Sequence, residues 1–182
     1  MTVLNEILIK HPRDAIALLI NDDSISYGNL QKDVDDFARY LLAGKTDLAE
    51  ECVAMLLPAG RDYVIALLGI WRAGGVAVPL STAAASKELE YALRTARATR
   101  LIANDENAEK IAASCKTLNI EVDSVIDQPG ALTVALPSVS ADRRAMMLFT
   151  SGTTSQPKGV VTTHRNITAQ ITALIEAWQW GA

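Results

Sequence analysis

Residues 52–80, CVAMLLPAGRDYVIALLGIWRAGGVAVPL, decide the fold class. Residues 52–57 form an apolar run with the length of a buried strand. A helical stretch at 63–72 follows, ends at two glycines, and leads into a second apolar strand at 76–80. Strands that are apolar throughout and are separated by helices are typical of a parallel sheet with helices on both faces.

The alternation continues along the rest of the chain. Its predicted elements are a helix at 88–97, a strand at 101–103, a helix at 108–115, strands at 146–149 and 160–163, and a helix from residue 166 onward. Prolines and a glycine mark residues 127–140 as a surface connection. Residues 51–182 are therefore predicted to have an α/β fold with a mostly parallel sheet, ending in a loop and a helix.

Residues 1–50 follow different patterns. Apolar residues at helical spacing predict a first helix on Val3, Leu4, Ile7 and Leu8. Two short runs on either side of Asn21-Asp22-Asp23 predict a β-hairpin at 15–27, and an amphipathic helix is predicted at 30–42. We expect residues 1–182 to form one partial domain, in which residues 1–50 contribute a helix, a hairpin and a second helix.

The composition is that of a folded, mildly acidic domain. The chain has 182 residues, of which 49% are hydrophobic, and a formal net charge of -4. Its basic residues are scattered, which argues against a nucleic-acid-binding surface. Cys52 and Cys115 match no metal-binding or redox spacing, so we expect reduced thiols in or near the core.

The sequence also bears on the compartment. No apolar stretch approaches the roughly 20 residues that span a bilayer. Residues 1–11 lack the basic start and the unbroken apolar run of a signal peptide. We expect a cytoplasmic protein without a membrane span.

A loop with phosphate-binding chemistry follows the strand at 146–149. Residues 150–159 read TSGTTSQPKG and contain five hydroxyl side chains. Backbone N–H groups and hydroxyls of such a loop can converge on phosphate oxygens, and Lys158 can neutralise their charge. Gly152 allows close approach of the backbone to an anion, whereas Pro157 restricts the loop. The residue types therefore predict a phosphate site between two buried strands.

Two other interpretations of this loop are weaker. A Walker loop, G-x-x-x-x-G-K-[ST], fails because Pro157 replaces its second glycine and Gly159 replaces its hydroxyl residue. A phosphotransferase with a degenerate loop of that kind stays open as one hypothesis for the function. A solvated Ser/Thr-rich turn would not explain the combination of two glycines, a proline and a lysine.

The run from Thr150 to Val160 resembles the phosphate-loop signature of the adenylate-forming superfamily, which includes acyl-CoA synthetases, luciferases and peptide-synthetase adenylation domains. Residues 66–79, ALLGIWRAGGVAVP, are similar to the family's alanine-glycine-glycine signature, and Ser26-Tyr27-Gly28-Asn29-Leu30 resembles its tyrosine-containing turn. These matches occur in the family's order over essentially the whole chain. In one departure, Ser155 stands where the family usually has glycine, which reduces backbone freedom in the loop.

The resemblance implies an AMP-forming acyl-CoA synthetase. In such an enzyme a carboxylate attacks the α-phosphate of ATP, and coenzyme A then captures the acyl group. The residues that would contact the β- and γ-phosphates are Thr150, Ser151, Gly152, Thr153 and Thr154. Lys158 would order the loop and offset the charge of the leaving pyrophosphate. The implied cosubstrates and cofactors are ATP, Mg²⁺ and coenzyme A.

The same resemblance implies that this chain is a truncated N-terminal domain. The adenine-contacting segment, the acidic magnesium ligand, the ribose-binding aspartate and the C-terminal domain with its catalytic lysine would lie downstream of Ala182. We therefore expect the chain alone to be inactive, and its open sheet to favour self-association. A stand-alone nucleotide-binding module of the same fold is the alternative.

The last predicted helix bears on the substrate. Residues 163–178 resemble short dicarboxylate (malonate-type) synthetases, and medium-chain and aryl acids are left open as substrates.

Several other residues allow a structural or a functional interpretation. His164 is either a residue that positions the loop or a hydrogen-bonded structural histidine. Trp178, Trp180, Leu174 and Ile175 are expected to form the packing face of the last helix. The acidic run at 33–36 is expected to be a solvated helix face rather than a metal site.

Overall fold

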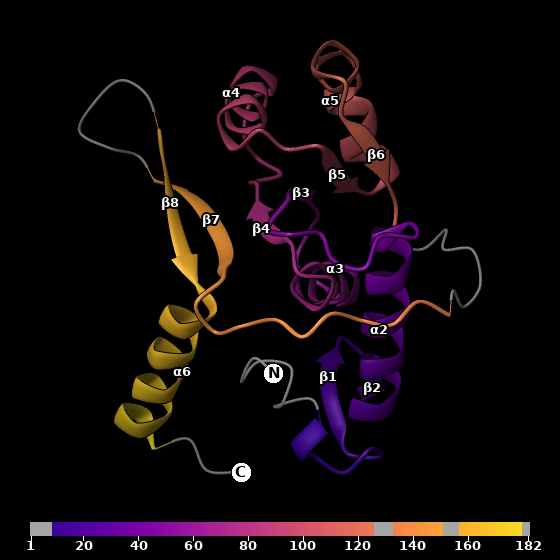
Figure 1. The fold of residues 1–182 in the computed structure, drawn as a ribbon, viewed down its shortest axis with the longest axis vertical. Coiled ribbons are helices and arrows are strands. Elements are labelled where there is room, and N and C mark those ends of the chain that lie inside the picture. Colours follow the sequence, from indigo (N-terminus) through magenta and orange to yellow (C-terminus); the bar gives the residue numbers. More distant parts are fainter. Residues whose placement is uncertain (1–8, 126–132, 151–156, 180–182) are drawn as a thin grey trace.

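The computed structural model describes residues 9–125, 133–150 and 157–179. Their helices and strands, labelled in Figure 1, are β1 (Ile16–Ile20), β2 (Asp23–Ser26), α2 (Tyr27–Leu42), β3 (Cys52–Leu56), α3 (Arg61–Arg72), β4 (Val76–Pro79), α4 (Ser86–Ala96), β5 (Arg100–Ala103), α5 (Asp105–Leu118), β6 (Glu121–Asp123), β7 (Arg144–Thr150), β8 (Lys158–Thr163) and α6 (His164–Trp178).

Six of these strands form one sheet in the order β6-β5-β3-β4-β7-β8. Neighbouring strands are parallel from β6 through β7, and only β8 runs antiparallel, paired with β7 at the edge. The prediction of a mostly parallel α/β sheet is confirmed. The hairpin β1–β2 is also confirmed, and it forms a separate two-stranded sheet.

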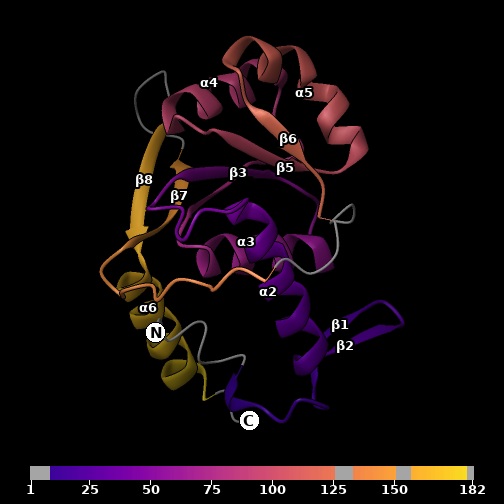
Figure 2. The same cartoon turned by 45° about the vertical axis from the view of Figure 1, so that its right-hand side comes forward.

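Helices cover both faces of the large sheet. Figure 2 shows α4 and α5 on one side of the strands, and α2 and α3 on the other. In β3, Val53 and Met55 pack with α2 and α3, whereas Ala54 and Leu56 pack with α4 and α5. Because successive strand residues point to opposite faces, a strand buried on both sides must be apolar throughout. This explains the unbroken apolar run at 52–57.

Helix capping explains why two helices begin before their apolar pattern does. Asn104 accepts a hydrogen bond from the backbone N–H of Asn107, so α5 begins at Asp105 rather than at the predicted residue 108. Thr163 accepts from the N–H of Asn166 and starts α6 at His164.

The acidic side chains of α2 form ion pairs with basic side chains of α3. Asp33 bonds to Arg61 at 2.7 Å, and Asp35 bonds to Arg72 at 2.9 Å, so α2 is tied to α3. The face expected to be solvated is thus partly covered, with side-chain exposures of 26% for Asp33 and 20% for Asp35. The two helices also approach closely at Gly69, where a Cβ atom would lie 2.5 Å from Cδ1 of Phe37.

The packing face predicted for the end of the last helix is wrong. Trp178 is 60% exposed and Ile175 is 42% exposed, and the residues of α6 that pack against the core are Ile167 and Ile171. Trp180 and the predicted first helix on Val3, Leu4, Ile7 and Leu8 lie outside the described residues. Among the helices that the structure describes, none combines the length and apolar character needed to cross a membrane.

Candidate functional site

The loop singled out in the sequence joins β7 to β8 at one edge of the sheet. Thr150, the last residue of β7, is the antiparallel partner of Lys158, the first residue of β8. The structure therefore brings these two predicted site residues together across the neck of the loop. The other four, Ser151, Gly152, Thr153 and Thr154, lie outside the described residues, as does Ser155.

The neck of the loop lies at the carboxyl end of the sheet. Because β7 is parallel to β4, Thr150 ends its strand at the same edge of the sheet as Pro79 ends β4. The strand order reverses beside β4: α3 leads from β3 to β4 on one side, and the chain then returns past β3 to β5. Open α/β sheets bind ligands beyond the carboxyl ends of their strands near such a reversal.

A cavity of about 360 Å³ opens at this place. Its wall comes from the end of β4, from α4 and from both sides of the loop neck, and its polar members are Ser81, Glu88, Tyr91 and Thr150. One polar contact joins the helix to the loop: the hydroxyl of Tyr91 donates a hydrogen bond to the carbonyl oxygen of Pro157 at 3.1 Å. The sequence interpretation missed Tyr91, because nothing in its local pattern distinguishes it from a packing residue of α4.

Lys158 is placed to interact with an anion. Its side chain is exposed, and it makes no ion pair with any residue in the described ranges. Lys158 therefore keeps its charge available at the end of the loop, where phosphate oxygens would need it. The flanking strands are less buried than predicted, because Leu148, Val160 and Val161 are 40%, 47% and 41% exposed.

The alanine-glycine-glycine segment, residues 73–75, lies at the opposite, amino end of the sheet, just before β4. Gly74 has a φ of +82°, and a Cβ atom there would lie 2.2 Å from Oδ1 of Asp47. Arg143 donates to the Gly74 carbonyl at 2.6 Å and grips both carboxylate oxygens of Asp47. Hydrogen bonding from Arg143 lowers the pKa of Asp47. This network joins the entry to β4 with the entry to β7.

His164 lies at that same end of the sheet, after the last residue of β8 and therefore remote from Lys158. Its side chain is 1% exposed and meets the ring of Trp71 edge-on, with the ring centroids 5.7 Å apart. Neither ring nitrogen has a hydrogen-bond partner among the described residues, so the interpretation as a hydrogen-bonded histidine is wrong. Burial, and then the positive charge of Arg143, lower the pKa of His164 from 6.5 to about 4, against an opposing effect of Glu50.

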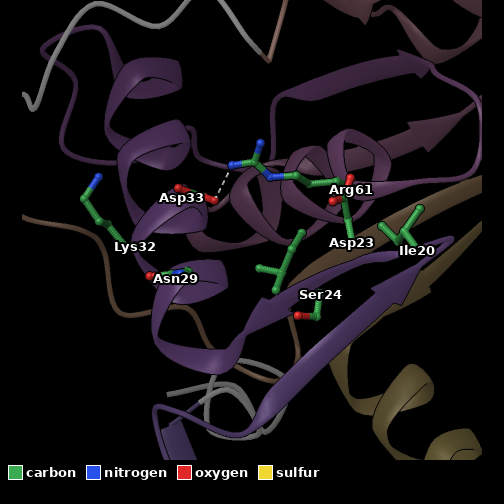
Figure 3. A pocket seen from close by; sticks show the side chains of 8 residues that line it. Ile20, Asp23, Ser24, Asn29, Lys32, Asp33 and Arg61 are labelled. Atoms are coloured by element: carbon green, nitrogen blue, oxygen red, sulfur yellow. Dashed lines mark hydrogen bonds and ion pairs between the residues drawn. The ribbon is translucent and has the colours of Figure 1, made fainter.

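A larger cavity, of about 520 Å³, lies between the hairpin and the start of α3 (Figure 3). Its charged residues balance one another: Arg61 pairs with Asp33, Lys32 bonds to Asp36 outside the cavity wall, and Asp23 adds a negative charge. This balance makes the cavity a poorer anion site than the loop neck. Within the described ranges, no group of three or more His, Cys, Asp or Glu side chains is arranged to hold a metal ion.

The structure is an α/β domain in which the neck of the loop lies at the carboxyl ends of the parallel strands. The family model described as AMP-binding enzyme matches residues 6–181, and the chain belongs to this family. The resemblance to the adenylate-forming superfamily is therefore confirmed, and the fold matches the N-terminal domain of adenylate-forming enzymes.

Two CoA ligases are similar to this chain in sequence. The chain is 34% identical over 142 residues to malonate–CoA ligase ACSF3, mitochondrial, of Mus musculus, which covers 74% of this chain and 24% of that protein. It is 34% identical over 193 residues to a CoA ligase of Gibberella moniliformis, covering 96% of this chain and 32% of that protein. The chain thus spans about a quarter to a third of the length of these relatives.

Apo MatB from Rhodopseudomonas palustris superposes with a TM-score of 0.85 at 25% identity, over 97% of this chain and 38% of that one. ATP-bound MatB from the same organism superposes with a TM-score of 0.78 at 26% identity, over 97% of this chain and 37% of that one.

Proposed function

We propose that this chain is the ATP-phosphate-binding part of an AMP-forming acid–CoA ligase. The observation that carries the proposal is the loop neck, where Lys158 keeps an exposed and uncompensated charge at the carboxyl edge of the sheet. Membership of the AMP-binding enzyme family supports the same assignment. These relatives are named as CoA ligases, and we extend that activity to this protein as part of the proposal.

The proposed reaction has two steps. A carboxylate oxygen of the acid attacks the α-phosphorus of ATP, and the bond from that phosphorus to its bridging oxygen breaks, so that pyrophosphate leaves with the electron pair. The thiol of coenzyme A then attacks the acyl carbon, loses its proton and displaces AMP. The contribution of this chain is to position the phosphates and to offset the charge that develops on pyrophosphate.

Each site residue has a proposed part in that contribution. Thr150 and residues 151–154 would hold the β- and γ-phosphates through hydroxyl and backbone groups, while Lys158 would supply the positive charge. The described residues offer no carboxylate cluster for Mg²⁺. We therefore propose that Mg²⁺ enters with the ATP phosphates, as this ion commonly does, and finds its protein ligand elsewhere in the enzyme.

The chain by itself is proposed to bind ATP without turnover. It spans 24% and 32% of two CoA ligases and 38% of MatB, so most of a comparable enzyme lies outside it. The C-terminal domain with the catalytic lysine would belong to that remainder. Carboxylate-dependent exchange of ATP with pyrophosphate by the purified 182-residue chain would contradict this part of the proposal and would leave the binding site itself supported.

Malonate or a similar short dicarboxylate is the proposed substrate. The support is the name of the mammalian and amphibian relatives, malonate–CoA ligase, together with the resemblance at residues 163–178. Thioester formation by the full-length gene product should be faster with malonate than with octanoate or benzoate. A preference for either of the latter acids would replace this substrate class.

The open edge of the sheet is proposed to mediate self-association of the isolated chain. Among the described strands, β8 pairs with β7 and with no other, and its Val160 and Val161 are 47% and 41% exposed. An exposed apolar edge strand is a template for pairing with another copy.

We also keep the cytoplasm as the proposed compartment. Several relatives are named as mitochondrial, so subcellular fractionation is the measurement that decides between the two.

The test of the proposed function is a titration of the purified chain with ATP. We expect saturable binding that Lys158→Ala weakens by roughly tenfold or more, as expected when a charge-assisted phosphate contact is lost. Lys116→Ala is the matched control, because Lys116 lies in the last turn of α5, on the far helix of the sheet. Equal weakening by both substitutions would indicate a general charge effect and contradict the proposed site.

A further inference from the structure

A side chain of α4 holds Pro157, the residue that precedes β8. Tyr91 lies in the middle of α4, and its hydroxyl donates to the carbonyl oxygen of Pro157 at 3.1 Å, across 66 positions of sequence. The two residues belong to different layers of the fold, because α4 covers one face of the sheet (Figure 2), whereas Pro157 directly precedes β8, a strand of that sheet.

The acceptor of this hydrogen bond, the Pro157 carbonyl, is in a position to influence the orientation of Lys158. Proline has no N–H, so its carbonyl is the only backbone group by which position 157 can be held. That carbonyl and the N–H of Lys158 belong to one planar peptide unit. A bond to the Pro157 oxygen therefore fixes the plane from which the Lys158 side chain departs. Among the described residues, the pairing of β7 with β8 reaches Thr150–Lys158, and the Tyr91 hydrogen bond is made at the adjacent residue, Pro157.

The helix that carries Tyr91 is itself firmly held. On its inner face, Leu89 and Leu93 are each 1% exposed in the core shared with β3 and α5. At its start, Glu88 accepts a hydrogen bond from the backbone N–H of Ala85. On its outer side, Glu90 accepts a hydrogen bond from Ser114 of α5 at 3.0 Å. Tyr91 therefore extends from a rigid element, which is the property a positioning residue needs.

We propose that Tyr91 is a positioning residue that holds Pro157 and so directs Lys158 toward the phosphates of ATP. This inference rests on the proposed function of the loop. Tyr91 itself would not touch ATP, and it lies outside the signature segments 26–30, 66–79 and 150–160. Tyr91 and Pro157 both line the cavity of about 360 Å³, so removal of the Tyr91 hydroxyl would leave Pro157 free to shift into open space.

The experiment compares Tyr91→Phe with the wild-type chain in two assays. The first is the initial rate of trypsin cleavage after Lys158, followed by mass spectrometry without ATP. The second is the dissociation constant for ATP. We expect Tyr91→Phe to raise the cleavage rate and to weaken ATP binding, each by roughly threefold to tenfold, the range that loss of one neutral hydrogen bond produces. The melting temperature should stay close to that of the wild type, because the ring remains.

Tyr63→Phe is the matched control, since Tyr63 is half-buried on α3 and its hydroxyl has no hydrogen bond to a described residue. It should change neither assay. Equal cleavage and equal ATP affinity in Tyr91→Phe and wild type would overturn the inference about Tyr91, while leaving the Lys158 result intact. Absence of ATP binding by the wild-type chain would overturn the proposed function and, with it, the role of Tyr91 toward ATP.

Discussion

Acid should destabilise this fold through one buried histidine. His164 is 1% exposed, has no hydrogen-bond partner at either ring nitrogen among the described residues, and has a pKa of about 4 instead of 6.5. The folded chain therefore keeps the imidazole neutral at pH values at which the unfolded chain binds a proton. The unfolded state gains protons as the pH falls from 6.5 to about 4, so stability is lost over that window.

The size of the effect follows from the shift in pKa. At 1.36 kcal/mol for each pH unit, the complete loss between pH 6.5 and about 4 is about 3 kcal/mol, and about 2 kcal/mol of it falls between pH 7 and pH 5. Carboxylates with a lowered pKa, such as Asp47 and Glu50, lose their contribution only at lower pH, below their unfolded pKa near 4. Measurements from pH 7 to pH 5 thus separate His164 from them.

The assay is urea denaturation of the chain at pH 7, 6 and 5. Wild type should lose about 2 kcal/mol of unfolding free energy over this range. His164→Phe should lose far less, because it keeps a ring against Trp71 and cannot bind a proton. His11→Gln, which changes the other histidine of the chain, should behave as wild type. A wild-type loss below about 0.5 kcal/mol, or an equal loss in His164→Phe, would show that His164 is not the group responsible.

Two further perturbations follow from the geometry. Gly74→Ala should lower the unfolding free energy by about 3 kcal/mol in urea denaturation, because it combines a positive φ with displacement of Asp47. Gly44→Ala, which has a φ of +89° but open space, should cost only about 1 kcal/mol, and equal losses would contradict the steric argument. Val160→Lys on the edge strand should reduce self-association in light scattering, whereas Thr117→Lys on α5 should not. A wild-type chain that is monomeric at high concentration would contradict the proposed pairing.

The central strands were predictable because their burial leaves a strong local signal. Residues of β3 and β4 meet helices on both faces and must be apolar in succession, as the sequence shows. Strand β6 has no such signal, since Glu121 and Val122 are exposed. Distant side chains hold it in place: Arg100 bonds to Glu121, and Tyr40 bonds to Asp123. No local pattern contains those partners.

The position of the phosphate loop was predictable from its residue types, but the residues that hold it in place were not. Glycine, hydroxyl residues and Lys158 are types that bind phosphate, so the loop could be recognised in the sequence. Tyr91 could not be recognised in this way, because its proposed role depends on a hydrogen-bond acceptor 66 residues away. Trp178 illustrates the opposite error: an apolar residue at helical spacing was expected to be buried, yet it is 60% exposed, and Ile167 and Ile171 are the α6 residues packed against the described core cluster.

The backbone amides that respond to ATP would locate the phosphate site. In a two-dimensional ¹H–¹⁵N NMR titration of the 182-residue chain, we expect the largest shift changes at Thr150, Lys158 and Gly159, beside the loop neck. The larger cavity near Asp33 and Arg61 should stay unchanged. Shifts concentrated at Asp33 and Arg61, or none at the neck at saturating ATP, would contradict the assignment of the β7–β8 loop as the phosphate site.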